Sequence, residues 1–332
     1  MSMVDAFKAS TFNTISLSSS MNRLPFKPSR IAQMGLFGTR GVRNRSVVLE
    51  IIDGVLSLLP TAPWGTQGSL GTTVARKARN FACLHIPHDD VLLAADVQDV
   101  RQFGSEDSEA GVIQAVNDKL TVMRQRHEVT LEHLRAGAIK GNILDSDGST
   151  VLFNLFTEFG ISETTVAFLL ASETTTAREY CLDVARAIET ALGGLVYDHI
   201  HAFCGTEWFE KFIKNADVSG GYDRWQQGEF HRNDPRSGFN FGGIIFEEYR
   251  GSIGGVTFIP TAEARFFPVG VPGLFETYFA PADFIEAVNT VGLPMYAKQS
   301  VMEFDRGIKL HTQSNPLPMC TIPGVLIKGS TD

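Results

Sequence analysis

A long hairpin over residues 46–86 is the feature that most constrains the fold of this 332-residue chain. Its arms, SVVLEIIDGVLSL and TTVARKARNFACLHI, are rich in the β-branched and apolar residues that favour strands. Between them, PTAPWGTQGSLG (60–71) is dense in Pro and Gly and predicts the tip. Each arm of about twelve residues reaches roughly 40 Å. Both faces of the first arm are partly apolar and a lone two-stranded ribbon is marginal in water, so we expect the hairpin to need a partner surface.

A long amphipathic helix is expected next. Side chains at spacings of three and four residues form a single stripe on such a helix: Val112, Val116, Leu120, Met123, His127, Leu131, Leu134 and Ala138. Ser105, Asp107 and Ser108 offer N-caps, and Gly141 suits the end. The stripe predicts a helix that covers at least residues 112–138, well above the average helix length.

Short strands and helices follow. NILDSDGSTVLFNLFTEFG (142–160) predicts a hairpin that turns at Asp147-Gly148. Thr176 and Glu179 form a capping box that opens an amphipathic helix. Its inward residues are expected to be Cys181, Val184, Ala185, Ile188 and Leu192. This helix is expected to end at Gly193-Gly194, and a further short helix is expected to be capped by Thr206. Residues 280–290 are expected to form a short helix or structured loop. Strands are expected at 164–172, 195–203, 241–251, 255–270 and 307–329.

The charge of the chain is unevenly distributed. Residues 1–46 carry seven Lys and Arg against Asp5 alone, a net charge of +6. Since the whole chain carries −8, residues 47–332 carry −14. The basic segment is rich in Ser, Asn and Pro and lacks periodicity, which predicts an extended arm. The arm could touch nucleic acid or an acidic surface on a neighbouring subunit. The acidic body argues against a broad nucleic-acid-binding face and offers much negative charge, so we expect the second.

Composition limits the class of protein. A hydrophobic content of 43% is typical of a globular chain, and no apolar run approaches the ~18 residues that a membrane span needs. The N-terminus lacks a secretory signal pattern, so we expect a soluble, cytosolic product. No CxxC motif occurs, which favours free buried thiols at the four cysteines: Cys83, Cys181, Cys204 and Cys320.

The stretch HIPHDD (85–90) contains residue types that bind catalytic metals. A metal-dependent phosphohydrolase would need the His-Asp pair on helices and further ligands elsewhere, whereas Pro87 biases the backbone toward an extended form. We therefore expect a corner between a strand and a loop, with aspartates that cap or turn.

Three other stretches look chemical and are each interpreted as structural. DHIH (198–201) offers too few ligands for a metal site, and DSDG (145–148) lacks the glutamate that completes a calcium loop. The adjacent Glu247 and Glu248 point to opposite faces of a strand. The chain contains no GxGxxG, GxxxxGK[ST] or GxSxG motif. We expect no enzyme activity, no catalytic residue, no metal and no cofactor.

Several longer stretches carry a family resemblance. They are HIPHDDVLLAADVQDVRQFG, MRQRHEVTLEHLRAGAIKGNILDSDG, GTEWFEKFIKN, FGGIIFEEYRG, EARFFPVGVPGLFETYFAPAD and YAKQS with QSNPLPMCTIPGVLI. In number and order they resemble the lambda-like, tailed-phage major capsid protein E family over roughly residues 45–330. The resemblance implies the α+β, HK97-like major capsid fold.

The resemblance assigns a part to each segment. Residues 1–45 would be an N-arm that crosses neighbouring subunits, and 46–85 an E-loop that lies over an adjacent subunit. Residues 86–174 would be the P-domain, with 108–140 as its spine helix, and 175–290 the A-domain. Residues 291–332 would return to the P-domain as strands. The glycine-rich stretches 218–228 and 250–255 would be loops at the symmetry axes.

The implied function is that of a major capsid protein in the virion of a tailed double-stranded DNA phage. Hexamers and pentamers would assemble in the host cytoplasm into an icosahedral shell that expands as DNA is packaged. Its partners would be itself, a separate scaffolding protein, a portal and a decoration protein, with no membrane and no sequence-specific DNA contact. The alternatives are an encapsulin-like shell or tail-tube protein, and a metal-dependent hydrolase that uses His85, His88 and Asp89.

Two groups of residues are candidates for functional contacts. The first group, expected at subunit interfaces, consists of Trp64, Arg76, Lys77, Arg79, Arg40, Arg43 and Arg45. The second group, expected at the joint between the E-loop and the P-domain, consists of His85, Pro87, His88, Asp89 and Asp90. The work expected of this joint is to fix the angle at which the hairpin leaves the subunit.

Overall fold

The computed structural model of the protein describes residues 14–23, 29–52, 76–97, 108–170, 176–227 and 238–331. It divides into two compact units. Unit 1 comprises Met1–Val48, Asn80–Glu132 and Glu276–Met319, and unit 2 comprises Leu49–Arg79, His133–Phe275 and Cys320–Asp332. No helix among the described residues is long and apolar enough to cross a membrane.

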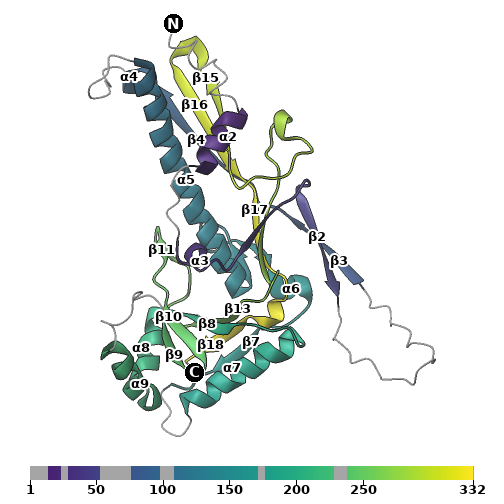
Figure 1. Ribbon diagram of the computed structural model, residues 1–332, viewed down its shortest axis with the longest axis vertical. Coiled ribbons are helices and arrows are strands. Elements are labelled where there is room, and N and C mark those ends of the chain that lie inside the picture. Colours follow the sequence, from purple (N-terminus) through teal and green to yellow (C-terminus); the bar gives the residue numbers. More distant parts are fainter. Residues whose placement is uncertain are drawn as a thin grey trace, which may run out of the picture. The chain divides into compact units, whose positions relative to one another are not determined.

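Unit 1 is built around a three-stranded sheet with the order β15-β16-β4. These strands are β15 (Tyr296–Val301), β16 (Gly307–Ser314) and β4 (Ile86–Leu93), and both pairings are antiparallel. The long helix α5 (Ser108–Lys140) and the short helix α2 (Thr14–Arg23) pack against it (Figure 1). Their shared core takes residues from every one of these elements: Leu17, Met21, Leu92, Val116, Leu120, Met123, Met295, Ala297, Ile308 and Leu310.

Helix α5 confirms the expected helix over 108–140. On the expected inward stripe, Val116, Leu120 and Met123 are buried, as is the polar His127, while Leu131 is half-buried. Gly141 follows the helix with φ +76°, a conformation that suits a residue without a Cβ. The apolar stripe thus places one face of α5 on the sheet.

Helix α2 contradicts the expectation of an extended arm. Leu17 and Met21, one helical turn apart, are buried in the core of unit 1. The Ser18 hydroxyl accepts from the backbone N–H of Ala297 at 3.0 Å, and Asn22 Nδ2 donates to the Met295 carbonyl at 2.9 Å. An apolar pair at i and i+4 therefore outweighs a composition rich in Ser and Asn.

A second sheet of unit 1 has the order β1-β14-β17. Its strands are β1 (Gly38–Gly41), β14 (Phe275–Phe279) and β17 (Pro316–Cys320), with β1 parallel to β14. The short elements near these sheets are α3 (Arg30–Gln33), α4 (Ala94–Val97), η3 (Ile285–Ala287) and η4 (Glu303–Asp305). The turn η3 confirms a short helical element within 280–290.

The predicted hairpin appears as a separate two-stranded sheet of β2 (Ser46–Ile52) and β3 (Arg76–Ala82). Both strands were expected from their β-branched and apolar composition. The expected tip at 60–71 lies outside the described residues.

Unit 2 contains a six-stranded mixed sheet with the order β7-β18-β13-β8-β10-β9. The strands are β7 (Thr164–Ala167), β8 (His199–Cys204), β9 (Phe239–Phe241), β10 (Ile244–Glu248), β13 (Ala264–Val269) and β18 (Ile327–Ser330). An aromatic cluster is buried here, in which Phe168 stacks on Phe266 and Trp208 stacks on Phe246. Fully burying one such side chain stabilises the fold by about 2–3 kcal/mol.

The longer helices of unit 2 among the described residues include α7 (Ala177–Leu192), α8 (Thr206–Lys214) and α9 (Ala216–Gln227). Helix α7 confirms the expected inward face, although Ala185 is only half-buried, and it ends at Gly193 as expected. Within the described residues the Thr176 side chain makes no cap bond; Asp217 Oδ2 accepts from the Ala177 N–H instead.

Two expectations for this region are wrong. The cap of α8 is Gly205, and Thr206 is already the first residue of the helix. Residue 205 has no room for a side chain, since a Cβ there would lie 2.1 Å from the Pro260 carbonyl oxygen. The expected glycine-rich loop at 218–228 is largely helix α9, since Val218 is buried and Tyr222 packs on Phe209.

The remaining elements of unit 2 are short. Strands β5 (Asn142–Leu144) and β6 (Val151–Asn154) confirm the hairpin that turns at Asp147-Gly148, with Gly148 at φ +69°. The expected hairpin stops early, because Asn154 caps a helical turn, α6 (Leu155–Phe159). The others are β11 (Ser252–Ile253), β12 (Val256–Thr257) and η5 (Pro323–Val325).

Candidate functional site

The stretch HIPHDD lies in an extended strand, so the expected corner at Pro87 is wrong. Residues 86–90 begin the eight-residue strand β4, which pairs with β16 from Ile86↔Ser314 to Leu93↔Gly307. Strand β4 is the edge of its sheet, where a proline without an N–H is tolerated. The change of direction falls earlier, in residues 83–85 between β3 and β4.

Strand alternation sends the two aspartates to opposite faces of this sheet. Asp90 lies on the α5 face and pairs with Lys119 Nζ at 3.0 Å, while Asp89 pairs with Lys309 Nζ at 2.9 Å and contacts His311. The hydrogen bond from Lys309 lowers the pKa of Asp89. Burial raises the pKa of Asp90, but the hydrogen bond from Lys119 and other contacts outweigh it and lower the pKa overall. Both carboxylates therefore fasten β4 to its neighbours.

The root of the hairpin is fixed by backbone hydrogen bonds. The N–H of Cys83, just after β3, donates to the carbonyl of Arg45, just before β2, at 2.9 Å. The N–H of Leu84 donates to the carbonyl of Pro316 in β17 at 3.0 Å. These bonds join the two ends of the hairpin to each other and then to the second sheet of unit 1.

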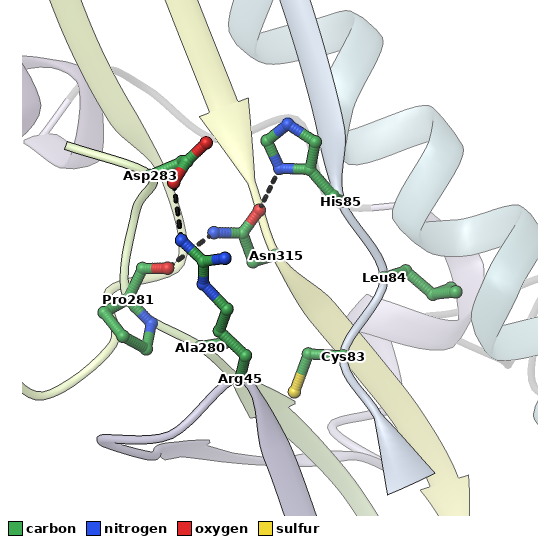
Figure 2. A pocket seen from close by; sticks show the side chains of 8 residues that line it. All are labelled: Arg45, Cys83, Leu84, His85, Ala280, Pro281, Asp283 and Asn315. Atoms are coloured by element: carbon green, nitrogen blue, oxygen red, sulfur yellow. Dashed lines mark hydrogen bonds and ion pairs between the residues drawn. The ribbon is translucent and has the colours of Figure 1, made fainter.

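Side chains complete this fastening (Figure 2). Arg45 Nη2 pairs with Asp283 Oδ1 at 2.5 Å, and His85 Nδ1 donates to Asn315 Oδ1 at 2.9 Å. The same Asn315 donates from Nδ2 to the Pro281 carbonyl at 2.8 Å. We call these five residues, Arg45, His85, Pro281, Asp283 and Asn315, the root clamp.

A pocket of about 250 Å³ opens within the root clamp and is also lined by Cys83, Leu84 and Ala280. Burial raises the pKa of the Cys83 thiol to about 11, so the group is protonated at neutral pH and is a poor nucleophile. The polar groups of the clamp are engaged with one another. The arrangement favours a mechanical function over acid–base chemistry.

The arginine candidates occupy different surroundings. Arg40 lies in β1 opposite Tyr278, Arg43 is exposed, and Arg79 is 3.8 Å from Glu158. Arg45 pairs within its own subunit, through the root clamp. Strand β3 contains Arg76 and Lys77, whose side chains lie outside the described part, as does Trp64.

The other stretches that looked chemical have structural partners. His201 Nε2 lies 3.1 Å from Glu247 Oε2 in the interior of unit 2, whereas Glu248 pairs with Arg250. Asp147 accepts from the backbone N–H groups of Ser149 and Thr150 in its turn. Within the described residues, no three His, Cys, Asp or Glu side chains gather as a metal ion would require.

Three residues of the root clamp, Pro281, Asp283 and Asn315, were not identified from the sequence. Asp283 and Asn315 lie more than 200 positions from Arg45 and His85, so local spacing could not identify them. Lys119 and Arg126 on α5 were also missed, although their partners in HIPHDD were singled out.

The fold is the HK97-like fold of phage capsid proteins. The capsid of Ralstonia phage GP4 aligns over 90% of this chain and 87% of its own, with a TM-score of 0.50 and 10% identity. A chain of the satellite phage P4 procapsid aligns over 90% and 93%, with a TM-score of 0.50 and 8% identity.

Sequence comparison identifies the family. The profile of the family described as phage major capsid protein E matches residues 13–331, and the chain belongs to that family. The major capsid protein of Pseudomonas phage KPP10 is 29% identical over 318 residues, which cover 90% of each chain. That of Salmonella phage Felix O1 is 22% identical and covers 99% of each chain. The protein is a major capsid protein of a tailed phage and a component of the virion.

Proposed function

We propose that the chain assembles into hexamers and pentamers of an icosahedral shell by laying its hairpin, residues 46–85, on an adjacent subunit. The observation that carries this proposal is that the two strands of the hairpin pair only with each other among the described residues. Among the described residues, β2 and β3 form a sheet of only two strands, and Val48 on β2 is 60% exposed. Such a ribbon gains stability from a partner surface, and a second copy supplies one in a shell.

The root clamp would hold the base of this hairpin in place, because the two ends of the hairpin are bonded to one another and to β17. The joint residues His85, Pro87, His88, Asp89 and Asp90 then act in assembly and in expansion. The interface candidates Arg40, Arg43, Arg76, Lys77, Arg79 and Trp64 would meet acidic surfaces of neighbouring copies.

We also propose the division into N-arm (1–45), E-loop (46–85), P-domain (86–174), A-domain (175–290) and returning C-terminal strands (291–332). The packing of α2 supports a narrower arm, since residues 14–23 belong to the subunit's own core. Any crossing to a neighbour would fall to other residues of the arm.

The further partners follow from family and charge. A scaffolding protein, a portal and a decoration protein would assist assembly in the host cytoplasm. The body of the chain is acidic, so packaged double-stranded DNA would be repelled from the wall rather than bound by sequence.

A structural function is preferred to a hydrolase that uses His85, His88 and Asp89. His88 and Asp89 are adjacent in a strand and point to opposite faces, so they do not share one metal ion. An encapsulin-like or tail-tube protein is less well supported, because the family match spans residues 13–331.

Deletion of residues 58–72 tests the part played by the hairpin. The shortened chain should fold with an unchanged melting temperature but form no shells, because the ribbon no longer reaches its neighbour. A second variant replaces residues 58–72 with Gly and Ser at equal length. This variant keeps the length of the hairpin but removes the side chains of its tip, so it shows whether shells need the length or the side-chain contacts. Normal shells from the deleted chain, seen by negative-stain microscopy, would show that the hairpin has another role.

A further inference from the structure

A buried histidine stands where α5 meets the sheet of unit 1. His127 lies on the inward stripe of α5 and is 3% exposed. Its Nε2 atom is 3.0 Å from the hydroxyl of Thr312 in β16. That hydroxyl donates in turn to the carbonyl of His88 in β4, at 3.1 Å. One chain of hydrogen bonds therefore ties the helix to two strands.

The geometry fixes which nitrogen of each ring carries hydrogen. The Thr312 hydroxyl has one hydrogen and donates it to His88, so it accepts from an N–H at His127 Nε2. When the His127 ring is neutral, its lone pair is therefore at Nδ1. Arg126 Nη1 lies 3.0 Å from His88 Nε2, and a guanidinium only donates, so the lone pair of His88 is at Nε2.

The surroundings oppose a positive charge on His127. Burial, then the nearby His88 and His311, lower its pKa to about 4. From β4, His88 approaches to a ring-centroid distance of 6.1 Å, and Arg126 stands beside it on the helix.

The carboxylates nearby are already paired with other cations. On β4, Asp90 pairs with Lys119, and Asp89 pairs with Lys309 and His311 of β16. Glu128, the next residue along α5, pairs with Arg124. A proton added to His127 therefore meets basic neighbours and acids that are engaged elsewhere.

We propose that His127, Thr312 and His88 form an acid-operated latch that holds α5 on strands β4 and β16. The latch is closed while His127 is neutral. A proton from solvent, added at Nδ1, makes an imidazolium that this buried site does not stabilise, and the helix separates from the strands so that the ring reaches water. This inference goes beyond shell assembly, and it holds for the single subunit.

The direction of the pH effect follows from linkage. In the unfolded or opened chain the imidazole titrates near its ordinary pKa of 6.5, whereas in the closed latch it titrates near 4. The open state binds more protons between these values, so the latch is fully stable above about pH 6.5 and weakens by about tenfold per pH unit down to about pH 4.

The test is hydrogen exchange in the full-length, unassembled chain, followed from neutral pH to about pH 4.5 and corrected for intrinsic rates. The wild type should lose protection in α5 residues 118–131 and in β4 and β16, by about tenfold or more. His127→Gln keeps an N–H for Thr312 but does not titrate, so it should retain protection. The matched control is the variant His133→Gln. His133 is a second buried histidine on the same helix, and its side chain is bonded to the Asp145 carbonyl. This variant should lose protection at low pH as the wild type does.

Equal pH profiles for the wild type and His127→Gln would overturn the proposal. If His127→Gln does not fold at neutral pH, carbon-13 NMR of labelled histidines in the wild-type chain decides the matter. A His127 midpoint near 4 supports the latch, and a midpoint near 6.5 contradicts it. Because no step requires a shell, failure here leaves the proposed assembly function unaffected.

Discussion

At the residue scale, buried ion pairs differ sharply from exposed ones. Arg265 in β13 is 8% exposed, donates from Nη1 to Glu163 at 2.6 Å and pairs with Glu263. We expect Arg265→Met to lower the free energy of unfolding by about 3 kcal/mol, because Glu163 loses its cation and Glu263 keeps only Lys328 at a half-buried site. Urea unfolding measures the change.

The control for this prediction is Arg186→Met. Arg186 lies 3.4 Å from Asp183 on the exposed face of α7, where an ion pair contributes at most about 0.5 kcal/mol. Similar losses of unfolding free energy in Arg265→Met and Arg186→Met would contradict the difference in burial between the two arginines.

Residues show both the strength and the limit of reasoning from sequence. The proline, histidines and aspartates of HIPHDD were predicted to form a joint rather than a metal site. Their location in an edge strand was missed, because the pairing with β16 involves residues more than 200 positions away. Local patterns contain no information on such partners.

At the element scale, α2 is part of the core and not a loose arm. Met21 is fully buried against α5 and β15. We expect Met21→Ala to lower the free energy of unfolding by about 3 kcal/mol, through lost burial and the cavity that remains. The half-exposed Met302 provides a matched control, for which truncation to Ala should cost about 1 kcal/mol or less. Equal costs, measured by thermal or urea unfolding, would mean that α2 does not pack as described.

Elements with a strong repeating pattern were predicted well, and elements held by tertiary contacts were not. The stripe of α5 extends over many turns, so the existence of this long helix followed from periodicity. Helices α2 and α9 are short, and both contain residues that weaken helices, Ser in α2 and Gly in α9. Burial of Leu17, Met21 and Val218 overrides that propensity, and burial is not visible in one sequence.

At the scale of the whole molecule, the order of the segments pointed to the family before any site did. The hairpin and the long helix followed from patterning, and the α+β, HK97-like assignment followed from the family resemblance. The root clamp could not be predicted, because it joins Arg45 and His85 to distant loop residues. A shell subunit of this kind has its function distributed over contacts between copies.

The central claim is that the hairpin 46–85 leaves its subunit at the root clamp and lies on the next copy. Cryo-electron microscopy of shells formed by the full chain, with a scaffolding protein where needed, tests it most directly. The account predicts hexamers and pentamers in which density for β2 and β3 continues from the clamp onto an adjacent subunit. Shells in which the hairpin folds back on its own subunit would contradict it.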